Sequence, residues 1–434
     1  MADPYPIRPI TEAEFSAFSN VDEHAFNGGP LQEAELALVL RRFEFDRSLA
    51  AFDSDVPVGI AGAYGFRLTV PGGTVPAAGV TWVSVLPTHR RRGTLRSIMR
   101  RQLSDLAEGN EPVAALWASE AMLYGRYGYG KASWHASFTI GRGEGTLSGD
   151  APRDESVRLR LVSPEDARPE LAKVFDTVAQ TRPGFYARND AWWDLRLHDP
   201  EPRRDGHGPL RCLLAESRPS AGEDGGPRGY ALYSALGEWD TNTFLPSGTI
   251  DVRELMGADP AAEAALWENL LSRDLVTQVK TRLRPADDPL LFQLTDPRRL
   301  RPTISDGLWI RIVDLPAALT ARRYAAPVEV VLEVRDELLP ANAGRWRLAA
   351  PGPGADGARP GTPVAHSPDP VCERTSDAPD ISLDVSELGA AYLGGTQLGS
   401  LATAGLITEH LPGSVARLSA AMTWSPSPWC PQIF

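Results

Sequence analysis

The segment Val83-Ser-Val-Leu-Pro-Thr-His-Arg-Arg-Arg-Gly-Thr-Leu-Arg96 decides the fold of this chain. It begins as an apolar, β-branched strand, turns at Pro87, and continues as a basic stretch that opens a helix. The first backbone N–H groups of a helix have no internal partners, and the helix dipole adds partial positive charge there. Arg90 to Arg92 add side-chain charge, and Gly93 lets the backbone approach an anion closely. The segment therefore predicts a phosphate or pyrophosphate site.

Three adjacent arginines would by themselves also fit a solvated helix start or a local contact for nucleic acid. The formal net charge of the chain is −12, however, so the protein as a whole repels nucleic acid and attracts cationic ligands. The spacing Arg90-x-x-Gly93-x-Leu95 after a strand is similar to the acetyl-CoA pyrophosphate loop of GNAT-superfamily acetyltransferases, in which the last position is Gly or Ala. The lysine-bearing phosphate loop of nucleoside triphosphatases is absent from the sequence.

A second informative segment is Trp117-Ala-Ser-Glu-Ala-Met-Leu-Tyr-Gly-Arg-Tyr-Gly-Tyr-Gly130. The strand predicted at 113–117 should lie beside the first, and the glycines suit a tight turn into the next strand. The turn carries three tyrosines, and a phenol can act as a general acid toward a leaving thiolate. Aromatic packing is the alternative role for each of these tyrosines.

The segment Trp424-Ser-Pro-Ser-Pro-Trp-Cys-Pro-Gln-Ile-Phe434 is rich in aromatic residues and proline. Chain ends are usually polar and frayed, so this composition predicts a tail that packs against the protein. A docked tail would place its terminal carboxylate at a defined point, where the carboxylate could serve as a base. Packing alone is the simpler role, and composition favours it.

Together these segments resemble the enhanced-intracellular-survival (Eis) family of actinobacterial acetyltransferases. The resemblance covers the whole chain, and several spaced motifs occur in the family's order. These motifs are Thr88-His-Arg-Arg-Arg-Gly93, Ala118-Ser-Glu120, Tyr124-Gly-Arg-Tyr-Gly-Tyr-Gly130, Leu388-Gly-Ala-Ala-Tyr-Leu-Gly-Gly395 and the Pro428-Trp-Cys tail that ends in Phe434.

The resemblance implies an α/β (α+β) chain in three parts. These are a catalytic GNAT domain at 1–145, a second GNAT-like domain without activity at 150–302, and a domain like sterol carrier proteins at 303–434, whose tail enters the active site. Family members are typically hexamers that transfer acetyl from acetyl-CoA to amines. We expect one acetyl-CoA site per chain, because the second domain lacks an Arg-x-x-Gly loop.

Hydrophobic periodicity and turn residues predict the elements around the phosphate loop. Thr11 and Glu14 form a capping-box pattern at the start of the first helix. We expect helices at 11–18, 31–42 and 92–109, strands at 48–52, 56–68 and 75–85, a strand at 307–313 that opens the third part, and loops at 217–228 and 350–369.

The resemblance also assigns roles in the reaction. In the family, the first tyrosine of the Tyr-Gly-Arg motif is the general acid and the terminal carboxylate is the base, which implies Tyr124 and Phe434 here. GNAT folds place the pantetheine arm along the strand that contains Val83 and Val85, where the Val85 N–H would polarise the thioester carbonyl. The other acetyl-CoA contacts implied are Arg90, Arg91, Gly93 and Thr94 to the pyrophosphate, and Ser119.

The first two helices of GNAT folds wall the acceptor pocket, which implies that Glu23, His24, Phe26 and Glu33 contact a cationic amine substrate. Acidic groups would hold ammonium groups, and an aromatic face adds cation–π attraction. A solvated helix face is the alternative for each of the four residues. Aminoglycosides with several amines are the expected substrates. Protein lysine or a metabolite amine is the alternative acceptor, and a non-catalytic lipid-binding protein is the alternative of a different class.

Composition sets the remaining limits. The 434 residues are 42% hydrophobic and 23% charged, as in ordinary globular proteins, and no apolar run is long enough for a transmembrane helix. The N-terminus lacks the basic and apolar pattern of a secretory signal. The cysteines, Cys212, Cys372 and Cys430, match no metal or redox spacing and suit a reducing compartment. These features predict a cytoplasmic protein that needs no metal, and the family resemblance implies that it is a homo-oligomer.

Overall fold

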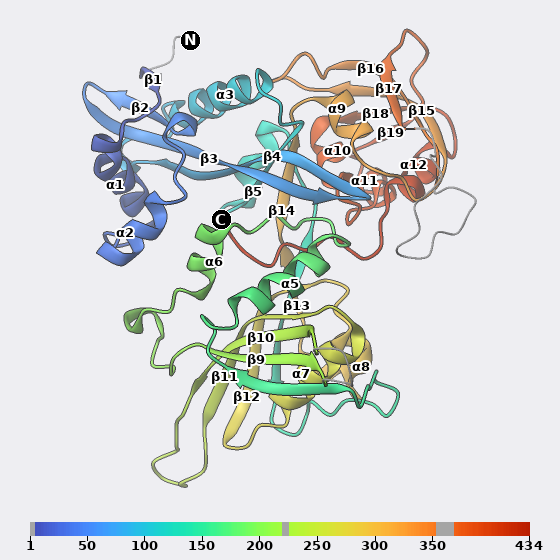
Figure 1. Ribbon diagram of the computed structural model, residues 1–434. Helices are drawn as coiled ribbons and strands as arrows, with labels where there is room; N and C mark the ends of the chain where they lie inside the picture. The colour runs from blue at the N-terminus through green and yellow to red at the C-terminus, as the bar shows by residue number, and fades with distance from the viewer. Residues whose placement is uncertain (1–4, 219–224, 353–368) are drawn as a thin grey trace. The chain divides into compact units, whose positions relative to one another are not determined.

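The computed structural model describes residues 5–218, 225–352 and 369–434 (Figure 1). The chain divides into two compact units. The first unit comprises Met1–Ser133, Gly307–Pro428 and Ile433–Phe434, and the second comprises Trp134–Asp306 and Trp429–Gln432. The central parts of the loops expected at 217–228 and 350–369 lie outside the described residues.

The larger sheet of the first unit has seven strands, which are antiparallel to their neighbours except where β4 and β5 run parallel. Their order is β1 (Ile7–Arg8), β2 (Leu49–Asp53), β3 (Val56–Val70), β4 (Gly73–Val85), β5 (Val113–Trp117), β14 (Leu308–Ile312) and β6 (Tyr129–Lys131). The helices on this sheet are α1 (Phe15–Phe26), α2 (Glu33–Leu40), α3 (Thr94–Ala107) and α4 (Ala121–Tyr124). The predicted capping box of Thr11 and Glu14 is present.

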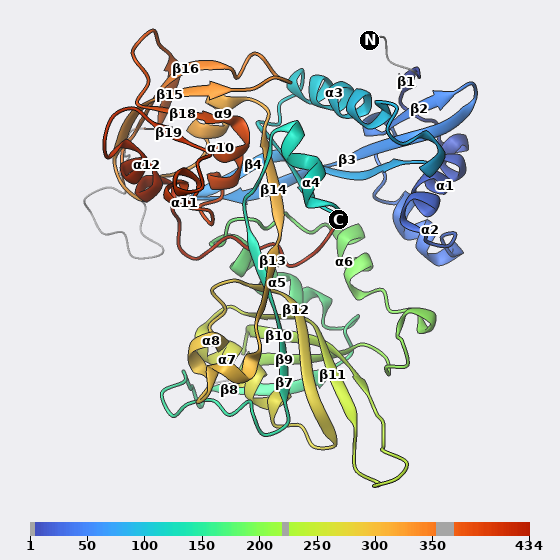
Figure 2. The same ribbon diagram turned by 180° about the vertical axis from the view of Figure 1, so that it is seen from behind.

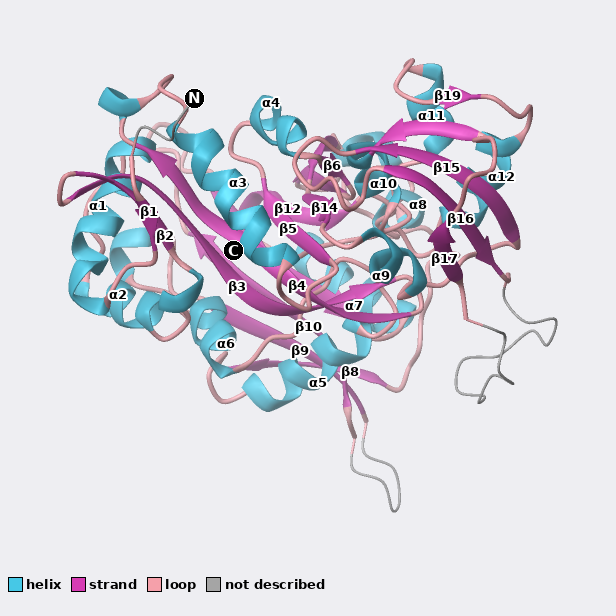
Figure 3. Ribbon diagram, turned by 90° about the horizontal axis from the view of Figure 1, so that it is seen from above, coloured by secondary structure: helices cyan, strands magenta, loops and turns pink. Residues whose placement is uncertain are grey.

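Both faces of this sheet are covered by helices, and α3 lies over one of them (Figure 3). Successive side chains of a strand point to opposite faces, so β2 contacts both layers. Ala50 and Phe52 pack with the apolar face of α1, whereas Ala51 between them packs with Ile98 of α3. Because the two faces are both buried, β2 is apolar at four successive positions instead of alternating with polar residues.

The second unit contains another seven-stranded sheet with the same pattern of pairing. Its strands are β13 (Thr303–Asp306), β7 (Trp134–Gly141), β12 (Val276–Pro285), β11 (Gly248–Gly257), β10 (Pro227–Leu236), β9 (Arg211–Ser217) and β8 (Val157–Val162). The only parallel pair among these described strands is β11 with β12, which corresponds to β4 with β5. Its helices are α5 (Arg168–Ala179), α6 (Asp190–Leu197), α7 (Pro260–Leu271) and α8 (Leu290–Gln293).

Two strands do not pair within the part of the sequence that contains them. The strand β14 was expected to open the third part, but it pairs with β5 and β6 of the first sheet. Figure 2 shows β14 apart from β15 and β16 of that part. In return β7, which lies inside the expected first domain, belongs to the second sheet. An apolar strand pattern does not indicate which sheet the strand joins. Position in the sequence was therefore a poor guide to the partners of these two strands.

The part expected to resemble sterol carrier proteins belongs to the first unit. Its five-stranded sheet has the order β17 (Val371–Arg374), β16 (Gly344–Ala350), β15 (Val328–Arg335), β18 (Ile381–Asp384) and β19 (Thr408–Glu409). The helices are α9 (Leu315–Thr320), α10 (Val385–Ala391), α11 (Leu398–Thr403) and α12 (Ser414–Met422). Across the described ranges, none of the helices has the length and apolar character needed to cross a bilayer.

Two glycines bring this part directly against the larger sheet of the first unit. A Cβ on Gly130 of β6 would lie 1.9 Å from the Ser386 carbonyl oxygen and 2.4 Å from the Ala390 nitrogen of α10. A Cβ on Gly389 would lie 2.3 Å from the Ile310 carbonyl oxygen of β14. The glycines of two motifs quoted above therefore have one physical explanation, which is the backbone contact of α10 with β6 and β14.

Replacing Gly130 with alanine should destabilise the first unit, because the new methyl group meets backbone atoms that cannot rotate away. Overpacking of this kind costs about 1–3 kcal/mol or more. Gly125→Ala is the matched control, since a Cβ there meets no atom within 4 Å. Urea-unfolding midpoints of the two variants test the idea, and equal midpoints would contradict the proposed contact.

Candidate active site

The parallel strands β4 and β5 separate toward their carboxyl ends. Their register runs from Ala77↔Val113 to Gly79↔Ala115 and then stops, although β4 continues to Val85. On its other edge β4 has a bulge, because its pairing with β3 shifts where Trp82 adopts a φ of 56°. The last residues of β4, Val83 and Val85 among them, therefore have no ladder partner on the β5 side.

The turn after β4 leads into the start of α3 as the sequence predicted. Arg91 has a φ of 63° and Gly93 a φ of 91°, and α3 begins at Thr94. A Cβ on Gly59 of β3 would lie 2.8 Å from the Thr94 methyl carbon, so glycine there lets the helix start approach the sheet. The free N–H groups of α3 thus begin close to the separated end of β4, where an anion can bind.

The loop arginines do not share one role. The Arg90 guanidinium donates hydrogen bonds to the carbonyl oxygens of Val85 at 3.3 Å and Ala25 at 3.2 Å, and so it braces the loop. The Arg91 side chain is exposed and available to a ligand. Thr94 is buried, and its hydroxyl lies 3.5 Å from the His89 carbonyl oxygen. The expected pyrophosphate contacts are therefore together in space, with Arg90 already engaged by the protein.

A cavity of about 460 Å³ adjoins the separated strands. It brings together Val83, Ser119, Tyr124, Phe434 and Phe26 from the predicted set. The other described residues that line it are Asp22, Val39, Arg42, Tyr64, Val80, Thr81, Trp82, Trp117, Ala118 and Ile433. The ring of Phe434 packs edge-on against Phe66 at 4.8 Å, which holds the last residue of the chain at this cavity.

Tyr124 and Tyr64 are the buried tyrosines among the described residues of this cavity, and Tyr124 belongs to the predicted set. Tyr124 is 4% exposed, and its ring lies edge-on to Tyr129 at 6.1 Å. Burial raises the pKa of Tyr124, while a hydrogen bond with the Ser119 side chain offsets part of this shift. Tyr124 is therefore protonated at neutral pH and faces the cavity as a potential proton donor.

Asp22 lines the cavity with a carboxyl group, and the sequence did not single it out. Its Oδ1 accepts a hydrogen bond of 2.6 Å from the Ser84 hydroxyl, and burial raises the pKa of its carboxyl group. Asp22 and Phe26 are four residues apart, so they share one face of α1. The four-residue spacing from Phe26, which was a predicted site residue, could have indicated in the sequence that Asp22 faces the cavity.

The other three residues expected on the acceptor wall do not line the cavity. Glu23 accepts a hydrogen bond of 3.0 Å from Ser19 on its own helix. His24 and Glu33 are exposed on the helix surface. One residue along a helix turns the side chain by about 100°, which explains why the neighbour of Asp22 points elsewhere.

The second unit lacks the anion site at the corresponding helix start. The residue before α7 is Asp259, whose carboxylate accepts from the backbone nitrogens of Ala261 at 3.1 Å and Ala262 at 3.0 Å. Arg228 binds the same carboxylate at 2.8 Å. An acidic side chain thus takes the N–H groups that α3 leaves free, which favours one coenzyme site per chain.

A metal site requires several ligating side chains that converge on one point. Among the described residues, no group of three or more His, Cys, Asp or Glu side chains is arranged to hold a metal ion. The three cysteines are buried and form no disulfide.

Protein-family models match three stretches of the chain. An acetyltransferase (GNAT) domain matches residues 6–132, a second acetyltransferase (GNAT) domain matches 184–312, and a sterol carrier protein domain matches 315–431. The chain is 35% identical to the N-acetyltransferase Eis of Mycobacterium bovis, over 84% of this chain and 82% of the relative. The chain belongs to the Eis family of GNAT N-acetyltransferases.

Other Eis-like proteins agree with this assignment. An uncharacterized N-acetyltransferase of Streptomyces coelicolor is 43% identical over 98% of this chain and 99% of its own. The crystal structure of Eis1 from Mycobacterium abscessus is 34% identical, with a TM-score of 0.79 over 99% of this chain and 100% of its own. The expected α+β fold, with two GNAT domains and a sterol-carrier-like domain, is confirmed, and GNAT domains imply an acyl-CoA substrate.

Coenzyme A should bind with a stoichiometry of one per chain, and Arg91→Ala should weaken it about tenfold to a hundredfold, because a charge-assisted hydrogen bond is lost. Isothermal titration measures both quantities. Arg100→Ala is the matched control, since Arg100 is exposed on the same helix away from its start. Two sites per chain, or equal losses in both variants, would contradict this assignment.

Proposed function

We propose that this Eis-family enzyme transfers acetyl from acetyl-CoA to amines of cationic small molecules, including several amines of aminoglycosides. The observation that carries the proposal is that Tyr124, Phe434, Val83 and Asp22 line the same cavity. Acetylation of an amine needs a proton donor, a base and a binding strand for the coenzyme. The cavity offers a buried phenol, two possible carboxylates and a strand with unpaired backbone groups. The net charge of −12 also favours the approach of cations.

The residues at the separated strands fit acetyl-CoA. Arg91, Gly93 and Thr94 would hold the pyrophosphate at the start of α3, and the β4 residues Val83 and Val85 would pair with the pantetheine arm. When bound, acetyl-CoA supplies an acetyl group activated as a thioester. The Val85 N–H would donate to the thioester carbonyl oxygen and stabilise the charge that develops there. Ser119 keeps the Tyr124 hydroxyl oriented.

Proton transfers complete the proposed reaction. The carboxylate of Phe434 accepts the proton from the amine nitrogen as that nitrogen bonds to the acetyl carbon. Tyr124 donates its proton to the sulfur as the carbon–sulfur bond breaks, and the products are an amide and a thiol. Asp22 holds the ammonium group of the acceptor, and Phe26 adds an aromatic face.

The same chemistry could act on other amines. Protein lysine and metabolite amines are the alternative acceptors, and competition among an aminoglycoside, a polyamine and a lysine peptide separates them. The homo-hexamer and the cytoplasmic location implied by the family remain part of the proposal.

The interior of the sterol-carrier-like part disfavours the lipid-binding alternative. Arg322 is fully buried there, and its guanidinium donates to the carbonyl oxygens of Ala391 at 3.2 Å and Met422 at 2.7 Å. A buried guanidinium bound to carbonyl groups is a poor lining for an apolar ligand.

Extending the chain by a few residues after Phe434 should abolish turnover with a multi-amine aminoglycoside, because the base would become a peptide carbonyl. Acetyl-CoA binding and the fold should be retained. The same residues added at the N-terminus are the control. Thiol release measures turnover, and if both extended forms match the native enzyme, the base lies elsewhere and Asp22 becomes the candidate. Absence of turnover on any amine in the native enzyme would contradict the proposed function.

Asp22→Asn should raise the KM for the cationic acceptor about tenfold, which corresponds to about 1.4 kcal/mol of lost attraction. In the native enzyme this KM should also rise as the pH falls through the raised pKa of Asp22, since the protonated carboxyl no longer attracts a cation. This rise should occur above the usual Asp range and be absent from the variant. Glu23→Gln, on the same helix but outside the cavity, is the control and should behave like the native enzyme.

The same titration has an effect on stability. The folded state favours the protonated form of Asp22, so its contribution to stability increases as the pH falls through the raised pKa. Urea unfolding of Asp22→Asn should lack that increase. A native-like pH dependence of stability in this variant would show that Asp22 is not the buried titrating group.

A further inference from the structure

The second unit has the same strand separation as the first. Its parallel pair β11 and β12 is in continuous register from Thr249↔Gln278 to Val252↔Thr281, and the pairing then stops. A bulge in β12 follows at once, where its pairing with β7 shifts and Leu283 adopts a φ of 54°. In the first unit the corresponding separation adjoins an open cavity.

Protein side chains fill the separation in the second unit. Arg284 is 2% exposed, and its guanidinium donates across the gap to the Leu255 carbonyl oxygen of β11. It also binds Asp288 at 2.6 Å and Glu263 of α7 at 2.6 Å. A guanidinium held by two carboxylates and a carbonyl leaves no room for a coenzyme arm.

The tail segment Trp429–Gln432 completes this filling. The indole N–H of Trp429 donates to the Leu283 carbonyl oxygen, which the bulge turns out of the ladder. The indole ring lies 5.3 Å from the ring of Phe185 and 5.2 Å from the Arg284 guanidinium carbon. Trp429 is 5% exposed and belongs to the apolar core between α5 and β10.

The backbone of the tail is held as closely as its side chain. The Trp429 nitrogen donates to the Pro183 carbonyl oxygen at 2.8 Å. Gly184 has a φ of 97°, and a Cβ there would lie 2.8 Å from the Trp429 carbonyl oxygen and 3.1 Å from its nitrogen. Only glycine at this position admits the tail backbone.

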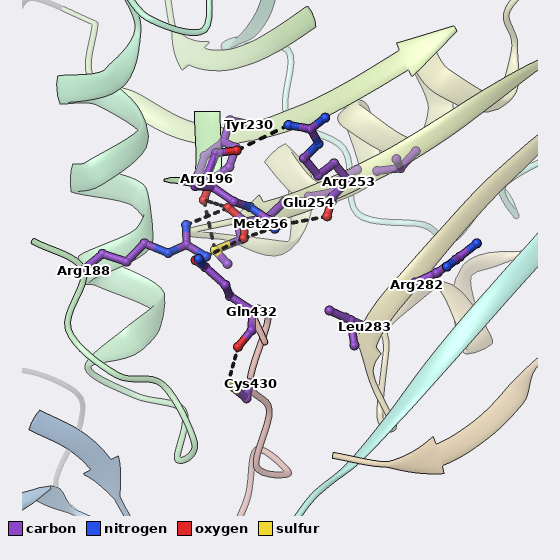
Figure 4. A network of polar contacts seen from close by, with 12 residues as sticks. Arg188, Arg196, Tyr230, Arg253, Glu254, Met256, Arg282, Leu283, Cys430 and Gln432 are labelled. Atoms are coloured by element: carbon purple, nitrogen blue, oxygen red, sulfur yellow. Dashed lines mark hydrogen bonds and ion pairs between the residues drawn. The ribbon is translucent and has the colours of Figure 1, made fainter. Parts of the chain in front are cut away.

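A buried ion-pair network supports the next residues of the tail (Figure 4). Arg188 binds Glu254 at 2.9 and 2.7 Å, and the Tyr230 hydroxyl donates to the same carboxylate at 2.6 Å. The Cys430 thiol lies 3.2 Å from the Gln432 carbonyl oxygen, and both residues are drawn beside this network in the figure. A buried network of paired charges is rigid, so the second unit presents a fixed structure beside this part of the tail.

We propose that the second GNAT-like unit is a receptor for the chain's own segment Trp429–Gln432, and that this docking positions Phe434 for catalysis. The proposal rests on the proposed function, in which Phe434 supplies the base. One peptide bond joins Gln432 to Ile433, and Ile433 and Phe434 line the cavity of the first unit. Trp429 and Gly184 are thus positioning residues, and the second unit has exchanged coenzyme binding for tail binding.

The central test compares Gly184→Ala with Gly143→Ala. Both glycines have positive φ, 97° and 74°, so both variants carry a similar backbone strain. A Cβ on Gly143 meets nothing within 4 Å, whereas a Cβ on Gly184 meets the Trp429 backbone. Hydrogen exchange of the tail peptide 425–434 reports docking without reference to activity. Steady-state kinetics with an aminoglycoside report kcat and the two KM values.

Gly184→Ala should speed exchange of the tail peptide and lower kcat by about tenfold to a hundredfold, because the base is no longer held in place. The KM for acetyl-CoA should stay within about twofold, since the α3 start is untouched. Gly143→Ala should leave all of these unchanged. Unaltered hydrogen exchange of the tail peptide in Gly184→Ala would overturn the proposal that the second unit binds the tail. Faster exchange with full kcat would overturn the positioning role.

A second pair of variants separates the loss of one hydrogen bond from the loss of an indole ring. Trp429→Phe deletes the N–H that reaches Leu283, and Trp267→Phe deletes a buried indole N–H that has no hydrogen-bond partner. Trp429→Phe should speed exchange of the tail peptide and lower kcat, although less than Gly184→Ala does. Trp267→Phe should change neither quantity. Equal effects would mean that general packing, not docking, is measured. If the native enzyme acetylates no amine, the proposed function fails, while the exchange data still decide whether the tail is docked.

Discussion

The separation of β4 from β5 beyond Gly79 and Ala115 is the constraint on which the catalytic unit depends. A parallel sheet that stayed paired would leave neither a cavity nor unpaired backbone groups for a coenzyme arm. The bulge at Trp82 turns the strand away, and the loop with Gly93 then places a helix start at the opening. The proposed coenzyme site and acceptor site both use surface that this one departure from regular pairing creates.

The second unit shows what the same separation becomes when the anion site is lost. Asp259 satisfies the helix start from within the chain, and Arg284 and Trp429 take the space between the strands. Buried arginines are costly unless they are paired with acceptors. Arg284 binds two carboxylates and a carbonyl oxygen, and Arg188 binds Glu254 through two of its nitrogens. One fold thus supports an open substrate site in one copy and a closed, polar core in the other.

Local sequence predicted much of the catalytic fold. The helix start at Thr94, the capping box of Thr11 and Glu14, and the strands before the loop all follow from short-range patterns. The family motifs predicted that Tyr124 and Phe434 would matter, and both line one cavity. The role of Asp22 was not evident, because it depends on which face of α1 meets Ser84 of β4. The sheet that β14 joins was missed for a similar reason, since pairing partners far apart in sequence leave no local signal.

The position of β14 has a consequence for how the protein is made. This strand, at Leu308–Ile312, lies between β5 and β6 in the sheet. In the sequence, all seven described strands of the second sheet come between β6 and β14. During synthesis β5 must wait with an unpaired edge until the ribosome has released more than two-thirds of the polypeptide. An exposed strand edge invites pairing with other chains. A fragment that stops near residue 145 would lack β14, so the edge of β5 that β14 covers would stay open to pairing with other chains.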